Sequence, residues 1–103
     1  MARIPIGKKD ELKPGTMKKV EAQGMDEIVV ANVGGKFYAM RGLCNHQGGQ
    51  LADGEIEGNV VTCPWHGSKW DITTGKLVEF PIELDDEPTY KVVEEGDELY
   101  IEA

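Results

Sequence analysis

The stretch that decides the fold of this chain is Cys44-Asn45-His46, then a spacer of sixteen residues, then Cys63-Pro64-Trp65-His66. The two segments contain both cysteines and both histidines of the 103-residue sequence. Any metal chemistry that needs thiolate and imidazole ligands must therefore use these four side chains. Each segment offers one thiolate and one imidazole, whereas a Cys2His2 zinc finger pairs Cys with Cys and His with His. The mixed pattern indicates a centre with two unlike metal ions.

The second segment continues as CPWHGSKWDITTG from Cys63 to Gly75. This context, together with Cys-x-His, the spacer and Cys-x-x-His, resembles the Rieske iron–sulfur domain. The match is specific because ligand type, spacing and flanking residues all coincide. The resemblance implies a [2Fe-2S] cluster in which two Cys bind one iron and two His bind the other. It assigns Cys44 and Cys63 to the inner iron, and His46 and His66 to the outer iron near solvent.

The charge of such a cluster predicts its redox behaviour. Two ferric ions, two sulfides and two thiolates sum to zero when the imidazoles are neutral, while four thiolates would leave two negative charges. We therefore expect a potential above that of plant-type ferredoxins, within the span of roughly −150 to +300 mV of Rieske centres. Loss of the second ring proton of each imidazole in the oxidised state would couple the potential to pH in alkaline solution only.

Residues around the ligand pairs predict whether the protein resembles the high-potential or the low-potential members of the family. High-potential members carry an extra cysteine in each loop and join the two by a disulfide; here Gly49 and Trp65 stand at those places. The same members use a Ser and a Tyr hydroxyl to bond to cluster sulfur. This chain keeps Ser68 but has Trp70 in place of the tyrosine. The resemblance therefore implies a low-potential ferredoxin, although Ser68 can equally be a loop hydroxyl that bonds to backbone.

Other residues are expected near the cluster. Gly48 and Gly67 would let the backbone bend around sulfide and donate amide hydrogens to it, or they would serve turn geometry alone. Trp65 and Trp70 would shield the cluster from water, or they would pack in the core, which is favoured for Trp70. Pro81, in a third loop over residues 78–82, would cover the cluster.

A zinc site built from the same four ligands is the main alternative. Zinc accepts tetrahedral Cys and His, and such a site would only hold the two loops together. The glycine-rich loops favour the larger iron–sulfur cluster.

Length and charge limit the functions that this chain can have. With 103 residues we expect one domain, residues 1–103, which is too small for a separate catalytic unit. A ring-hydroxylating oxygenase subunit also needs a mononuclear iron site with further histidines, and none is left over. The net charge of −8 argues against nucleic acid. Acidic residues gather from Glu83 onward, either as a docking surface for a basic partner or as a solvated face beside the basic N-terminal segment.

The N-terminal sequence has no apolar stretch of the length that a signal peptide or membrane anchor requires. No cysteine pair remains for a structural disulfide, which fits a reducing compartment. We expect a cytoplasmic monomer with no membrane contact.

Short β-branched runs separated by Gly turns predict an all-β fold. Residues 27–33 and 36–40 around Gly34-Gly35, residues 70–72 and 76–78, and residues 90–93 and 99–101 are expected as hairpins, with a helical turn over residues 10–13. Turns at Asp53-Gly54 and Gly58-Asn59 bound short strands in the spacer. The resemblance implies an antiparallel barrel-like or sandwich base in which the chain ends pair. It also implies a small cluster-binding subdomain, residues 43–78, inserted into that base.

The leading hypothesis is a one-electron carrier without catalytic activity. Ferredoxins of this type pass electrons from a flavin-containing NAD(P)H ferredoxin reductase to a terminal oxygenase, here with His46 and His66 at the docking edge. One alternative is a small redox subunit of a reductase, similar to the small subunit of nitrite reductase, which would co-purify with a large partner. Another is a zinc-stabilised interaction module, which would be colourless.

Overall fold

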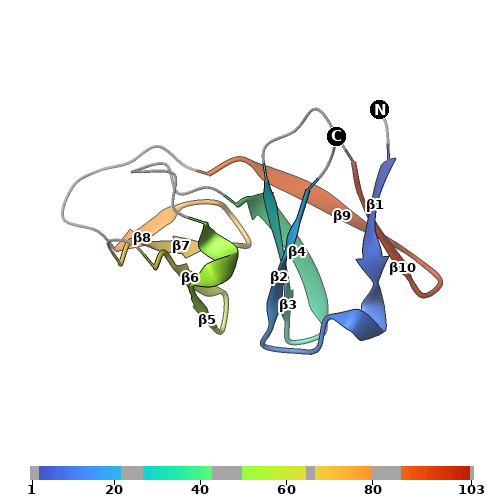
Figure 1. Cartoon of the computed structure of the whole chain (residues 1–103), viewed down its shortest axis with the longest axis horizontal. Helices are drawn as coiled ribbons and strands as arrows, with labels where there is room; N and C mark the ends of the chain where they lie inside the picture. The colour runs from blue at the N-terminus through green and yellow to red at the C-terminus, as the bar shows by residue number, and fades with distance from the viewer. Residues whose placement is uncertain (1–2, 22–26, 43–49, 65–66, 80–86, 103) are drawn as a thin grey trace.

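The structure is a computed structural model of the chain and describes residues 3–21, 27–42, 50–64, 67–79 and 87–102. Within these ranges the chain forms antiparallel strands and two short 3-10 turns, which confirms the all-β prediction (Figure 1). The elements are β1 Arg3–Lys8, η1 Lys9–Glu11, β2 Met17–Val20, β3 Ile28–Val33, β4 Lys36–Arg41, η2 Leu51–Asp53, β5 Glu55–Glu57, β6 Val60–Thr62, β7 Lys69–Asp71, β8 Leu77–Glu79, β9 Thr89–Glu95 and β10 Glu98–Glu102.

A six-stranded sheet in the order β1-β10-β9-β4-β3-β2 forms the base. Two of its hairpins were predicted, β3–β4 through Gly34-Gly35 and β9–β10 through residues 96–97. The expected helical turn is present as η1, one residue earlier than predicted. Pairing of β1 with β10 confirms that the two ends of the chain lie together. Among the described residues, no helix is long and apolar enough to span a membrane.

Strand β3 is the centre of the fold because it is buried on both faces. Ile28 and Val30 point to a core shared with β1, β4 and β10, and Val29 and Ala31 point to a second core on the other side. Side chains alternate between the faces of a strand, so a continuous apolar run is the pattern of a strand covered twice. The second core also contains Met40, so β3 and β4 connect the base to the residues after position 50.

The basic N-terminal segment lies beside the acidic C-terminal hairpin. Arg3 Nη1 is 2.9 Å from Glu95 Oε1, and Lys9 Nζ is 3.0 Å from Glu94 Oε1. All four side chains are more than one-third exposed, and pairs of this kind contribute at most about 1 kcal/mol. These contacts favour the solvated-face interpretation for this part of the acidic C-terminal region.

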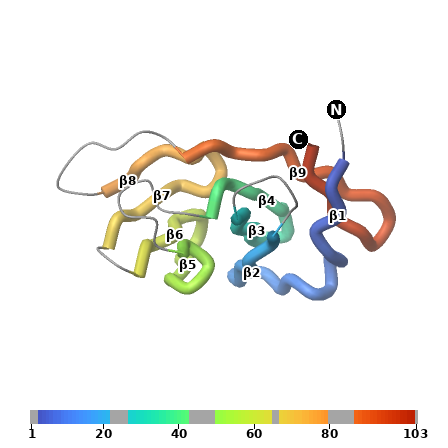
Figure 2. The backbone as a smooth tube through the Cα atoms, turned by 45° about the horizontal axis from the view of Figure 1, so that its top comes forward, coloured from blue at the N-terminus to red at the C-terminus, as the bar shows by residue number. Residues whose placement is uncertain are grey.

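A four-stranded sheet in the order β5-β6-β7-β8 lies at the end of the molecule opposite the β1–β10 pair (Figures 1 and 2). Its hairpins match the predicted strands in the spacer and around Thr74-Gly75. Its strands lie within residues 55–79, close to the predicted subdomain. The division at residues 43 and 78 stays a prediction.

Candidate metal centre

Cys63 is the one predicted ligand that lies in the described part of the chain. It directly follows β6, its thiol is free, and its side chain belongs to the second core, where it is 2% exposed. Trp70 and Leu51, both 0% exposed, are members of the same core. The following sites fall outside the described residues: Cys44, His46, Gly48, Gly49, Trp65, His66 and Pro81.

Backbone hydrogen bonds close the second ligand loop at its base. The Cys63 N–H donates to the Ser68 carbonyl at 2.8 Å, and the Gly67 N–H donates to the Cys63 carbonyl at 3.1 Å. Gly67 has φ +75°, in the left-handed region that glycine adopts without strain. The Gly67 amide thus forms a hydrogen bond of the turn, which agrees with the turn-geometry interpretation. Its contact with the cluster stays a prediction.

The ends of the first ligand loop also meet. The Leu51 N–H donates to the Gly42 carbonyl at 2.7 Å, across the segment that carries Cys44 and His46. The Gly42 N–H in turn donates to the Glu27 carbonyl at 2.6 Å, which ties the loop to the residue just before β3. Leu51 and Cys63 share one core, so the bases of the two ligand loops are held against the same packed side chains.

A buried hydrogen bond joins the side chains of Ser68 and Trp70 at the end of the second ligand loop. Trp70 Nε1 donates to Ser68 Oγ at 3.1 Å, and both side chains are 0% exposed. The packing interpretation of Trp70 is confirmed. The sequence identified the indole as a donor but did not identify Ser68 as its acceptor. Alternation in a strand places residues i and i+2 on one face, and that spacing was the available signal.

An ion pair that sequence reasoning missed joins the end of β4 to Glu87, two residues before β9. Arg41 Nη2 lies 3.4 Å from Glu87 Oε1, and the Glu87 side chain is 0% exposed. The Glu87 N–H donates to the Gly75 carbonyl at 2.7 Å, and the Arg41 N–H donates to the Pro88 carbonyl at 2.8 Å. Arg41 ends the strand that leads to the first ligand loop, so this pair connects that strand to the residues that lead into β9. Since 46 positions separate the partners, no local pattern could reveal the pair.

The Asp-x-x-Thr-Gly motif forms the β7–β8 turn. Asp71 Oδ1 accepts hydrogen bonds from Asn59 Nδ2 at 3.0 Å, from the Thr73 N–H at 2.9 Å and from Thr73 Oγ1 at 2.6 Å. The Gly75 N–H donates to the Asp71 carbonyl at 2.6 Å. Aspartate side chains that bond to the backbone two residues onward stabilise tight turns. The motif thus shapes the loop behind the second ligand pair.

The described residues fit a cluster with an inner and an outer side. No group of three or more Cys, His, Asp or Glu suited to a metal occurs within the described ranges, which include only one of the four predicted ligands. Along the second loop, Cys63 is buried, whereas Pro64 and Gly67 are exposed. A thiolate donor held in the core beside a loop that reaches solvent suits a cluster whose sulfur-ligated iron is the inner one.

A protein-family model described as the Rieske [2Fe-2S] domain matches residues 2–91. The ferredoxin component of biphenyl 2,3-dioxygenase from Rhodococcus jostii is 36% identical over 104 residues, which cover 99% of this chain and 94% of that protein. The ferredoxin component of a naphthalene 1,2-dioxygenase system from Pseudomonas aeruginosa is 32% identical, over 89% of this chain and 86% of that protein.

Solved structures show the same fold. The ferredoxin of Sphingomonas yanoikuyae B1 superposes with a TM-score of 0.92 at 29% identity, over 99% of each chain. A chain in the complex of reduced oxygenase and oxidised ferredoxin of carbazole 1,9a-dioxygenase gives 0.91 at 27% identity, over 96% of this chain and 91% of that one. The chain therefore belongs to the family of Rieske [2Fe-2S] domains and is an electron-carrying ferredoxin that binds a [2Fe-2S] cluster.

Proposed function

We propose that this protein is a cytoplasmic, monomeric one-electron carrier without catalytic activity of its own, which accepts electrons from a flavin-containing NAD(P)H ferredoxin reductase and delivers them to a terminal oxygenase. The main support for this proposal is the similarity, over nearly the whole chain, to a protein named as the ferredoxin component of a dioxygenase. Solved complexes of oxygenase and ferredoxin among its structural neighbours support the oxygenase as partner.

Cys44 and Cys63 hold the inner iron and His46 and His66 the outer iron in this proposal. When bound, the cluster supplies a site that gains and loses one electron. The burial of Cys63 beside the exposed Pro64 and Gly67 supports this order, because the histidine edge is then the side nearer to a docked protein.

The protein's contribution is a rigid frame. Both described loop bases are closed by backbone hydrogen bonds of 2.6–3.1 Å and rest on one packed core. A preorganised site changes little when charge is added to it, so little reorganisation opposes the electron transfer. The subdomain, residues 43–78, would present this frame to partners. The other proposed cluster contacts are Gly48, Trp65, Gly67, Ser68, Trp70 and Pro81.

The ligand roles are tested by His66→Cys. A third thiolate adds negative charge to the centre, so we expect a coloured protein with a lowered midpoint potential. Film voltammetry of the two holoproteins measures the change, and Lys76→Gln, at an exposed turn position, serves as the control. An unchanged potential in His66→Cys would show that His66 is not a ligand.

The carrier role is tested by anaerobic mixing. Holoprotein reduced with dithionite is mixed in a stopped-flow spectrometer with the oxygenase component of a biphenyl 2,3-dioxygenase system, and the oxidised absorption is followed. We expect reoxidation by one electron per cluster, with no product formed when substrate is present but the oxygenase is omitted. Product formation by the ferredoxin alone would contradict a purely carrying role.

A further inference from the structure

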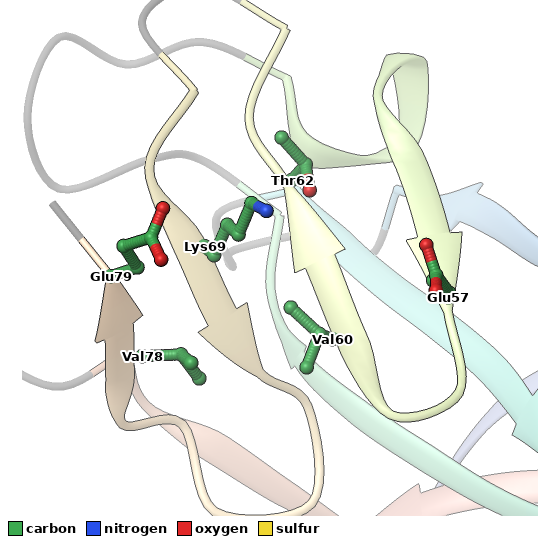
Figure 3. A pocket seen from close by; sticks show the side chains of 6 residues that line it. All are labelled: Glu57, Val60, Thr62, Lys69, Val78 and Glu79. Carbon is green, nitrogen blue, oxygen red and sulfur yellow. The ribbon is translucent and has the colours of Figure 1, made fainter.

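The four-stranded sheet has a hollow on the face that points away from the core (Figure 3). Its volume is about 280 Å³. All four strands contribute to it, so the hollow is a property of the whole sheet and does not belong to one loop. Its lining residues, which we call the outer-face pocket, are Glu57, Val60, Thr62, Lys69, Val78 and Glu79.

Strand alternation explains why this face is left open. Val61 and Trp70 are 0% exposed and point into the second core, so their strand neighbours point outward. Val78 is 53% exposed and is the one large apolar side chain that lies exposed in the described part of the chain. Val60, on β6, faces Val78 across β7, and the two valines supply the apolar part of the pocket lining (Figure 3). Apolar side chains with polar side chains around them can receive the aliphatic stem of a partner's lysine or arginine.

The rim of the pocket is acidic. Glu57 and Glu79 come from the outer strands β5 and β8, and Lys69 lies between them on β7 (Figure 3). Within the described residues, none of these three takes part in an ion pair, unlike Arg3 and Lys9 of the base. Two carboxylates against one ammonium leave a negative local charge, in a chain whose net charge is −8. The carboxylates are therefore available to a cation.

The pocket lies next to the base of the second ligand loop. Thr62 directly precedes the ligand Cys63, and Thr62 pairs with Lys69 across the sheet. Lys69 follows Ser68, whose carbonyl accepts the Cys63 N–H. A protein seated in the pocket would lie against the two strands that begin and end the second ligand loop.

We propose that the outer-face pocket docks a redox partner with a basic surface, which inserts a lysine or arginine side chain. The aliphatic stem of that side chain would lie on Val60 and Val78, and its charge would face Glu57 and Glu79. This inference rests on the proposed electron-carrier function and adds a second contact face to the histidine edge. A second copy of the chain is a poor occupant because the same acidic rims would meet and repel.

Cytochrome c, a basic one-electron acceptor, is a suitable probe. Reduced holoprotein is mixed with oxidised cytochrome c, and the second-order rate constant is measured from low to high salt. The Glu57→Gln/Glu79→Gln variant removes the rim charge. The matched Asp10→Asn/Asp97→Asn variant removes the same charge from exposed positions of the base. Both variants have a net charge of −6, from −8 plus 2, so any shared effect reports long-range attraction alone.

At low salt we expect the rim variant to react about fivefold more slowly than the base variant, with the difference vanishing at high salt. Val78→Thr keeps the shape of the side chain and the net charge, and it should slow the reaction at every salt concentration. Equal rates for the two charge variants, or a Val78→Thr rate equal to that of the unchanged protein, would overturn the proposal.

Sedimentation of the same samples tests the other occupant. A dimer that Val78→Thr abolishes would identify the pocket as a contact between copies and would also overturn the proposal. Failure of the carrier function is visible separately, because a protein without a dithionite-reducible cluster shows no bleaching before it is mixed with cytochrome c.

Discussion

Gly75→Ala should weaken the protein far more than the same change at Gly58. Both glycines lie in hairpin turns of the four-stranded sheet and both have positive φ, +79° for Gly75 and +61° for Gly58. A Cβ atom at Gly58 would meet open space, but at Gly75 it would lie 2.1 Å from the Glu87 carbonyl oxygen and 2.9 Å from Thr89 Cγ2. The comparison separates the cost of the backbone conformation from the cost of the close approach.

The shared conformational cost is about 1–2 kcal/mol for an L-residue in the left-handed region. At Gly75 the chain must also move away from Glu87, which stretches or breaks the 2.7 Å hydrogen bond from the Glu87 N–H to the Gly75 carbonyl. Loss of such a bond contributes about 1–3 kcal/mol when the groups are left unsatisfied. We therefore expect Gly75→Ala to lower the free energy of unfolding by about 2–5 kcal/mol. The excess over Gly58→Ala is about 1–3 kcal/mol, or at least about 4 °C in melting temperature for a domain of this size.

Thermal melts of the holoproteins, followed by far-UV circular dichroism and by visible absorption in one ramp, measure this difference. A fixed scan rate is needed because release of the cluster makes unfolding irreversible. In Gly75→Ala the visible absorption should be lost at a lower temperature than the far-UV signal. The displaced Glu87 pairs with Arg41, which lies at the start of the first ligand loop. Melting temperatures within about 2 °C of each other would refute the close-contact argument.

Three further changes test other parts of the structure. Trp70→Ala removes a fully buried indole and should lower the free energy of unfolding by about 3–5 kcal/mol. Trp70→Phe loses the hydrogen bond to Ser68 but keeps most of the packing, so its loss should be smaller. Denaturant titration of the two variants measures the order. Asn32→Ala removes the two hydrogen bonds of a buried side-chain amide and should cost about 2 kcal/mol by the same titration; a loss below about 0.5 kcal/mol would contradict the buried bonds. The hydrogen bond that Tyr100 donates to Glu98, with the nearby negative charge, raises the pKa of the Tyr100 phenol. Stability from this group is present below pH 10 and declines as pH rises through the folded-state pKa; Glu98→Gln should move the phenol carbon NMR titration to lower pH, and an unmoved curve would contradict the contact.

The hairpins were predictable because their signals are local. Residues 28–33 form a β-branched apolar run, Gly34-Gly35 supplies the turn, and each hairpin of the small sheet contains a glycine turn. Strands β1 and β2 were not predicted residue by residue. Pro5 and Gly7 interrupt the β1 pattern and coincide with a shift in its register, and Lys18-Lys19 makes β2 polar.

The ligand chemistry of the candidate site was predictable from the sequence, but the contacts that hold the site in place were less so. Ligand types and spacing identified the family, because only these four side chains can supply thiolate and imidazole. The Arg41–Glu87 pair and the approach of Gly75 to Glu87 depend on contacts between distant parts of the chain, which a single sequence does not reveal. The sequence favoured Trp70 as a core residue because so small a chain has few large aromatic side chains, whereas its hydrogen-bond acceptor, Ser68, is evident only from the packed structure.

The central claim is that two cysteines and two histidines of this chain bind one [2Fe-2S] cluster. An electron paramagnetic resonance spectrum of the purified protein after dithionite reduction tests it most directly. We predict a rhombic signal with an average g value below that of clusters with four cysteine ligands. A colourless, silent sample that contains zinc would contradict the claim.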